Sequence, residues 1–570
     1  MKIKDIIISS ALMLVVAPFA GAQNLDPTVV VNRAYEGKLV KMNKSSLVMA
    51  VPDSVSTFAL DFDYLVFEKP YKGADGFAPS VLTMKPAPTI YTPSKLYLRA
   101  GAGYTLHPTL DFVWSLVRSN VFQMNVYADH RSYVGDYRTF DLSGGRDYWR
   151  GYDLKSRAGV DGRMEFSNLS AGFDVSYYGL ASKDPNKTRM YDALDVKLGV
   201  SSKPKNGSYF KYDVLAAYRF AEDKLKYVDY GSGYLGEHVV NLDAELGQIM
   251  TGGHQIMMDI ESDVAIYAPS VVSQLSFVPR YVLLKERWGV DAGVRLSAII
   301  RSKDSQGLFG KQGQVVYPAI KAHFDVIPDA MRLYANIGGG NKLNTYGSIL
   351  KENHHADPLY GIGEFGLMNV TVERVSSALG LEGRIGTMFS YDLYGGYVNY
   401  ASDLLDAVVF GTRPTNGEDL YLPGFGYGSY QKCFASADWR LISEDFCFDG
   451  GVQYTYAWGL DSQVGLFLPA AVTGDVNFEY NWNKRIFAGV DCKFSTGRHG
   501  DVWYKIPGAP GTEDAVIPGY VDLGVSFEYS VNRAFSVWAH GGNLLNMTIQ
   551  RNPLFAERGV NFTVGICLNL

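Results

Sequence analysis

The sequence predicts an all-β protein, a transmembrane antiparallel β-barrel of roughly 18–22 strands with a short N-terminal periplasmic arm. Three observations support this fold class. The last stretch, 560–570, alternates strictly between apolar and polar residues. Similar runs recur from Lys95 onward, many with a charged residue in the middle. Beyond the N-terminus, no apolar stretch approaches the roughly 20 residues that a membrane-spanning helix needs.

The last strand shows the pattern most clearly. Side chains of a strand alternate between two faces, so this strand has one apolar wall and one polar wall. A terminal strand of this kind suits a closed barrel, in which it pairs with the first strand and its apolar wall faces lipid. The alternative is the inner strand of a soluble β-sandwich. The apolar wall comprises Val560, Phe562, Val564, Ile566, Leu568 and Leu570.

Residues 1–22 are predicted to be a signal peptide. Lys2 and Lys4 precede an apolar run from Ile6 to Val16, and Ala20-Gly21-Ala22 is typical of a cleavage site. The first cysteine is Cys433, so no lipid anchor is expected near that site. The chain is therefore predicted to be exported to the Gram-negative cell outer membrane.

Residues 23–94 are predicted to form a periplasmic arm and linker. Short extended runs in this part are interrupted by several prolines, which remove backbone donors and favour extended neighbours. The prolines lie at positions 52, 70, 79, 86, 88 and 93.

Residues 95–570 are predicted to form the barrel itself. Mid-strand charges such as Arg163, Asp259, Arg295 and Asp491 would be costly in a dry sandwich core, but a wide barrel has a wet inner face. Short and long connections alternate, as expected for turns on the periplasmic side and loops outside. The predicted short connections are 119–120, 328–329, 481–484 and 532–533, and the predicted long ones are 136–153, 222–236, 302–313, 338–363, 402–429 and 496–519.

The amino-acid composition fits a membrane barrel and narrows the classes of molecule that the chain is expected to bind. The chain has 39 Tyr, 30 Phe and 60 Gly, which suits a barrel with aromatic girdles, and Trp439, Trp458, Trp482 and Trp538 are predicted to lie in those girdles. A net charge of −6 provides no basic footprint, so nucleic acid is not an expected partner. The alternation phases of the four cysteines argue against disulfides, and free thiols are expected.

No catalytic, cofactor-binding or metal-binding residues are predicted, and no cofactor is expected. The G-x-G-x-x-G stretch at 361–366 lacks the strand–helix context of a dinucleotide site. His354 and His355, with Glu352 and Asp357, have no strong metal spacing, so a solvated loop is favoured over a metal site. No histidine or serine lies in a nucleophile motif, so the chain is not expected to be an enzyme. The aromatic stretches 421–430 and 503–510 fit either ligand-binding loops or loops folded over the lumen.

Near the C-terminus, an N-L-x-N turn is followed by a loop with proline and aromatic residues and then by G-x-x-F-x-x-G. The residues are Asn543, Leu544, Asn546, Pro553, Phe555, Gly559, Phe562 and Gly565. This stretch resembles the end of a TonB-dependent receptor barrel, although such barrels most often end in Phe where this chain has Leu570. The arm before Lys95 is shorter than the plug domain of those receptors. The chain therefore looks like the plug-less, receptor-like barrels of Bacteroidetes, and the resemblance implies the barrel fold without implying TonB-driven uptake.

Two functions follow as hypotheses. The first is a transport or channel barrel that carries a small solute through its lumen, in contact with outer-membrane lipid. The second is a structural or accessory subunit whose residues 24–90 dock a periplasmic protein or a separate plug. The resemblance favours transport slightly.

Overall fold

The computed structural model describes residues 95–570 except for 105, 141–145, 205–206, 229–230, 268–270, 302–315, 329, 357–368, 413–418, 463–464 and 505–510. The predicted signal peptide, the predicted arm and the glycine motif at 361–366 lie outside the described residues.

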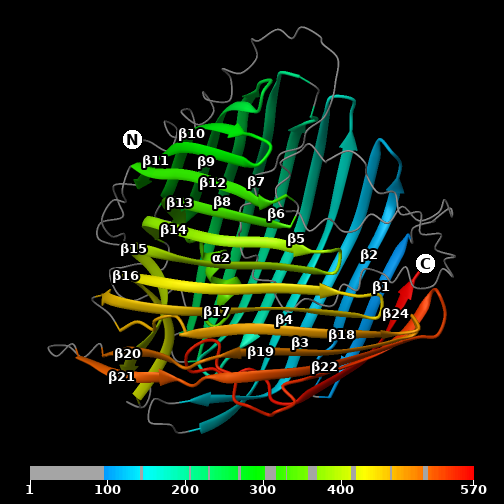
Figure 1. Cartoon of the computed structure of the whole chain (residues 1–570). Helices are drawn as coiled ribbons and strands as arrows, with labels where there is room; N and C mark the ends of the chain where they lie inside the picture. Colours follow the sequence, from blue (N-terminus) through cyan, green and yellow to red (C-terminus); the bar gives the residue numbers. More distant parts are fainter. Residues whose placement is uncertain are drawn as a thin grey trace.

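The described chain is almost entirely β-strand (Figure 1). Its elements are β1 (Leu96–Gly103), β2 (Thr109–Arg118), β3 (Phe122–Phe140), β4 (Arg146–Glu165), β5 (Leu169–Lys183), β6 (Lys187–Ser202), β7 (Tyr209–Tyr227), β8 (Gly231–Ile249), β9 (His254–Tyr267), β10 (Val271–Leu284), β11 (Trp288–Arg301), β12 (Val316–Ile327), β13 (Met331–Leu343), α2 (Tyr346–Glu352), β14 (Val370–Ile385), β15 (Phe389–Thr412), β16 (Asp419–Ile442), β17 (Phe446–Asp461), β18 (Val472–Trp482), β19 (Ile486–Ser495), β20 (Arg498–Tyr504), β21 (Gly511–Ile517), β22 (Tyr520–Ser530), β23 (Phe535–Gly542) and β24 (Asn561–Asn569).

The strands close into a ring. Each ring strand pairs antiparallel with its neighbours in the chain, β19 pairs with β22, and β1 pairs with β24 from Tyr97↔Asn569 to Gly103↔Thr563. β20 and β21 form a separate hairpin, and β20 runs parallel to β15 over three pairs around Val409↔Trp503. The described strands thus form a 22-stranded antiparallel barrel, which confirms the predicted fold class.

The two walls of β24 face opposite environments. Phe562 and Val564 are 51% and 63% exposed on the outside, whereas Asn561 and Thr563 are 4% and 5% exposed on the inside. The same division holds around the ring, where exposed outward residues include Leu198, Phe210 and Leu379. The barrel has an apolar exterior and a polar interior, as the alternation predicts.

One tryptophan departs from the girdle prediction. Trp538 points inward and is 7% exposed, with the Arg99 guanidinium 4.3 Å from its ring centroid. Its position follows from the phase of β23, in which Ser536 and His540 share its face. All four cysteines are free, as predicted.

The two ends of the barrel differ. At the short-turn end, no connection between ring strands is longer than the one between Ser202 and Tyr209. At the long-connection end, several segments predicted as loops are largely strand: β3 continues to Phe140, β7 to Tyr227 and β15 to Thr412. These hairpins extend the wall beyond the stretches that alternate by hydrophobicity alone.

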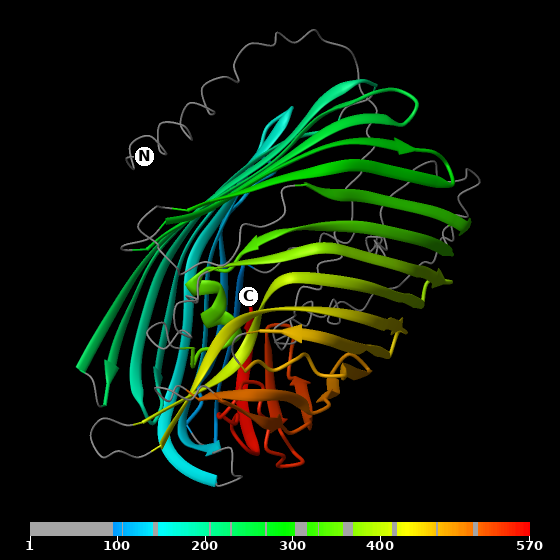
Figure 2. The same ribbon diagram turned by 90° about the vertical axis from the view of Figure 1, so that its left-hand side faces the viewer.

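Among the residues that the structure describes, no helix combines the length and apolarity required to span a membrane. The helix α2 is a single short element of 7 residues and lies inside the ring (Figure 2). This location places the start of the β13–β14 connection inside the lumen.

Candidate functional site: a segment folded into the barrel

The candidate site is the start of the β13–β14 connection, residues 344–356, which we call the inserted segment. Thr345 begins α2 as its N-cap and accepts a hydrogen bond from the Ser348 amide at 3.3 Å. The helix ends at Asn353, whose amide donates to the Ile349 carbonyl at 2.8 Å. An isolated helix of this length is unstable in water, so its packing inside the barrel must stabilise it.

The apolar face of the inserted segment packs on the inner wall. Tyr346, Ile349 and Leu350 are at most 2% exposed. They share one cluster with residues of β5–β10, β14 and β16, including Leu180, Ala193, Val239, Ala265, Val272, Val370 and Phe425. The segment therefore extends from β13 across the interior to strands that are distant around the ring.

The wall also binds the N-terminal end of α2. The amide of Gly347 donates to both carboxylate oxygens of Glu237 on β8, at 3.1 and 3.2 Å. The amide of Tyr346 donates to the Tyr267 hydroxyl at 3.0 Å, and that hydroxyl donates to Glu237 at 2.6 Å. The first amides of a helix lack partners within the helix and carry partial positive charge, so a carboxylate suits this end.

Positively charged side chains of β6 bind the opposite end of the segment. Arg189 on β6 donates to the carbonyls of His354 and Ala356, and Lys187 donates to the His355 carbonyl at 2.9 Å. Carbonyls at and beyond a helix C-terminus carry partial negative charge, which positive side chains stabilise. The wall thus presents opposite charges to the two ends of the segment.

A buried ion pair organises these contacts. The Arg189 Nε lies 3.0 Å from the Asp223 carboxylate of β7, and both side chains are fully buried. The Tyr346 hydroxyl also donates to Asp223. Because an unpaired buried charge is costly, Arg189 and Asp223 require each other, and Asp223 links the cation to α2.

Aromatic rings join the inserted segment to the β23–β24 connection and to strand β4. The His354 and His355 rings are 4.0 Å apart, and His355 stacks on Phe555 of the β23–β24 connection at 4.1 Å. Phe555 also contacts Trp149 of β4, edge to face at a centroid distance of 6.4 Å.

The N-L-x-N turn begins the β23–β24 connection. Asn543 adopts a positive φ of 47°, and its side chain forms hydrogen bonds of 2.8 and 3.0 Å with the Met547 backbone.

These histidines are not in the solvated loop that the sequence analysis favoured. His355 is 6% exposed, and burial together with the neighbouring cations lowers the pKa of both imidazoles well below their ordinary value. Over the described residues, no group of three or more metal-ligating side chains forms.

Of the aromatic stretch 421–430, the part whose side chains are described belongs to β16. There the Tyr427 hydroxyl accepts hydrogen bonds from the Asn344 side chain, at the start of the segment, at 3.2 Å and from the Asn369 amide, just before β14, at 3.0 Å.

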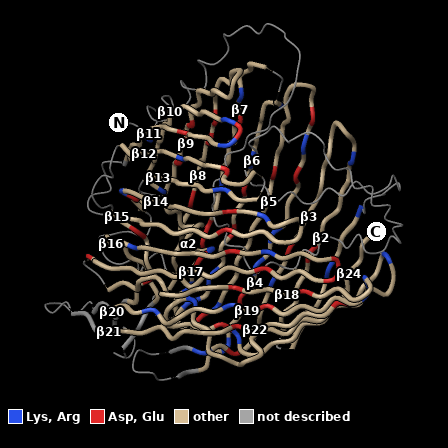
Figure 3. The backbone as a smooth tube through the Cα atoms, viewed as in Figure 1, with Lys and Arg blue, Asp and Glu red and all other residues tan. Residues whose placement is uncertain are grey.

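A different polar pattern lines the other side of the lumen. Four carboxylates lie in one cross-strand row on β14–β18. Glu382 is opposite Asp392, and Asp392 is opposite Asp438. On β17 the row passes through Gly451, which is opposite Asp438 on one side and Asp475 on the other. Arg332 stands at one end of the row and Lys493 at the other. We call this the acidic row. Figure 3 shows that charged residues recur along the strands of the barrel and are not confined to their ends.

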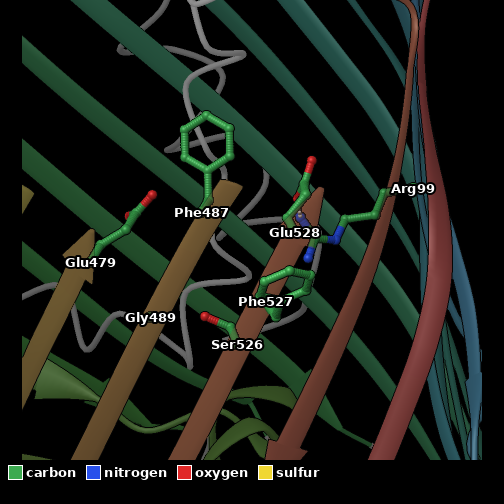
Figure 4. A pocket seen from close by; sticks show the side chains of 7 residues that line it. All are labelled: Arg99, Glu479, Phe487, Gly489, Ser526, Phe527 and Glu528. Carbon is green, nitrogen blue, oxygen red and sulfur yellow. Dashed lines mark hydrogen bonds and ion pairs between the residues drawn. The ribbon is translucent and has the colours of Figure 1, made fainter. Parts of the chain in front are cut away.

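A small recess lies near the short-turn end, where the ring closes (Figure 4). Arg99, Glu479, Phe487 and Glu528 line it, and Arg99 pairs with Glu528 at 3.2 Å. Its volume of about 20 Å³ accommodates roughly one water molecule, so it is not a solute site.

Sequence reasoning missed the residues that hold the segment. Lys187, Arg189, Asp223 and Glu237 share the inward phase of their strands, and that phase was the available signal. What the sequence lacks is any local sign that these charges contact residues 344–356, because the contacts join residues more than 100 positions apart.

The fold and this interior define a wide, closed β-barrel with an apolar exterior and a lumen partly filled by its own connection. Solved structures of similar fold include the siderophore receptor PirA from Acinetobacter baumannii (11% identity, TM-score 0.56, 83% of this chain and 80% of that one). Others are the FrpB iron transporter from Neisseria meningitidis (9%, 0.60, 84% and 81%) and the copper transporter OprC (11%, 0.60, 85% and 82%). At such identities the likeness shows the fold alone. No family model and no curated protein matches the chain.

Proposed function

We propose that this protein is an outer-membrane transport barrel that carries a small solute through its lumen. The observation that carries the proposal is the closed ring of 22 strands around a charged interior, because a barrel of this width can enclose a solute route whose inward charges set selectivity. The similar structures are described as receptors or transporters of siderophore, iron and copper, which supports transport for this chain as well.

The remaining sequence-based predictions complete this proposal. Residues 1–22 direct export, residues 23–94 form a periplasmic arm, and the barrel works without a plug domain of its own. The apolar exterior contacts outer-membrane lipid. The solute is small and the chain is not an enzyme, in keeping with the transporters and receptors of similar fold.

Planar-bilayer recording of the purified protein tests the proposal. We expect discrete ion-current openings from the mature chain and from a variant that lacks residues 24–90, because the ring closes through β1 and β24 without that stretch. A protein that never conducts, and that loses a co-purifying periplasmic protein when residues 24–90 are deleted, would instead support the accessory-subunit hypothesis.

A further inference from the structure

We propose that the inserted segment is a gate for the transport route, latched by the charged residues of β6–β8. This inference rests on the proposed transport function and adds its regulation. The segment lies across the interior near the long-connection end, from β13 to the β6–β9 wall (Figure 2). Through Phe555 it contacts the β23–β24 connection, and Phe555 in turn contacts Trp149 of β4.

The segment can leave without breaking the barrel. Strands β6–β9 pair with one another along their length, from Lys187↔Tyr227 to Ile249↔Gln255. None of these backbone pairs involves residues 344–356. The segment is instead held by side chains of the wall and by the packing of four buried residues of its own: Tyr346, Ile349, Leu350 and Ala356. Its release exchanges these contacts for water and leaves the ring intact.

The latch consists of three groups of contacts. Glu237 binds the first turn of α2, Arg189 and Lys187 bind the carbonyls at its other end, and Asp223 joins Arg189 to Tyr346. Four wall residues therefore hold the segment mainly through its backbone. Gly347 permits this close approach, since a Cβ there would lie 2.6 Å from the Tyr191 hydroxyl and 3.0 Å from Glu237.

The docked state also carries a cost. Within the described residues, Asn353 Nδ2 and His355 Nδ1 are buried without a hydrogen-bond partner. Each unsatisfied buried group opposes docking, because water would satisfy it on release. Strong latch contacts set against such costs give the balance that a reversible gate requires.

The test compares three variants of the full mature chain in planar bilayers. Arg189→Gln removes the cation that binds two carbonyls and Asp223. A second variant replaces residues 345–356 with a glycine-serine linker of equal length, which avoids leaving Asp223 buried and unpaired. Arg163→Gln is the control, since Arg163 is also an inward guanidinium on this side of the ring but pairs with Glu165, away from the segment. Heat-modifiable electrophoretic mobility verifies that each variant folds.

We expect the wild type and Arg163→Gln to be mostly closed. Arg189→Gln should raise the open probability at least about tenfold, because hydrogen bonds from charged groups change an equilibrium by this order. The linker variant should be open throughout. A wild type as open as the linker variant would overturn the gate and leave the transport function standing. If the folded linker variant never conducts, the transport function itself is contradicted.

Discussion

The two sides of the lumen use charge differently. On β6–β8, Lys187, Arg189, Asp223 and Glu237 are at most 3% exposed. Three of them bind the backbone of the inserted segment, and Asp223 binds the side chains of Arg189 and Tyr346. On β14–β18, the acidic row directs like charges toward the lumen, with cations only at its ends. Like charges directly opposite each other on neighbouring strands destabilise a sheet. The first wall therefore uses charge for structure, whereas the second retains charge at a cost in stability, as expected for a surface that meets solute.

The largest expected effect comes from preventing the inserted segment from docking on β6–β8. Gly347→Val places a branched side chain where even a Cβ would meet Tyr191, Arg219 and Glu237. The segment should fail to dock, and the mean bilayer current should rise at least about tenfold, since overpacking a close contact costs roughly 1–3 kcal/mol. Gly199→Ala on β6 is the matched control, because its Cβ has no neighbour nearer than 3.7 Å. Equal currents from both variants would contradict the close-packed docking described above.

The second prediction concerns the acidic row. In the linker variant, the combined changes Glu382→Gln, Asp392→Asn, Asp438→Asn and Asp475→Asn should shift the reversal potential toward zero under a salt gradient, because the row favours cations. The same changes should stabilise the barrel by less than about 1 kcal/mol per like-charge contact removed.

Glu261→Gln is the control for that experiment. Glu261 pairs with Arg295 at 2.6 Å, so its charge is already compensated locally. The reversal potential should move less than with the row variant. An equal shift from this single change would show that the row has no special influence on the ions that pass.

The third prediction is that acid weakens the latch. Burial and nearby cations lower the pKa values of His354 and His355 in the docked segment below the ordinary 6.5. The docked state thus binds fewer protons than the released state, so docking is strongest above about pH 6.5 and weakens as the pH falls below it.

The charged groups that face these two imidazoles come from two strands, β4 and β6. Lys187 and Arg189 of β6 and Lys155 of β4 oppose protonation, whereas Asp153 of β4, 3.4 Å from His354, favours it. We expect the open probability to rise several-fold between pH 7.5 and pH 5.5. The variant His354→Gln/His355→Gln should lose most of this pH dependence, and an unchanged profile would refute the role of the imidazoles.

The last prediction concerns stability at the seam where the ring closes, and no effect on the current is expected from it. Arg99→Met keeps an apolar side chain over Trp538 but removes the ion pair with Glu528, whose side chain is 9% exposed. We expect a loss of about 1–3 kcal/mol in the free energy of unfolding, measured by urea titration of the heat-modifiable form. Arg163→Gln, at a side chain that is 64% exposed, should cost less than about 1 kcal/mol.

Comparison of sequence and structure shows why some features were predictable. The ring strands, the outward face of β24 and the free thiols all follow from a period of two, which is a local property of the chain. The extended hairpins were missed because stretches such as 222–236 lie beyond the apolar band and no longer alternate by hydrophobicity. Trp538 was wrongly predicted to lie in the outward girdle because the prediction followed its residue type and ignored the phase of its strand.

The sequence by itself determined that the chain forms a closed β-barrel with an apolar exterior, because alternation in each strand specifies one oily and one polar face. Only the tertiary structure decided that residues 344–356 lie inside the barrel and that Arg189, Asp223 and Glu237 hold them there. These contacts join residues more than 100 positions apart. Such pairs come together only when the ring closes, and a local pattern carries no information about which inward charges will then meet.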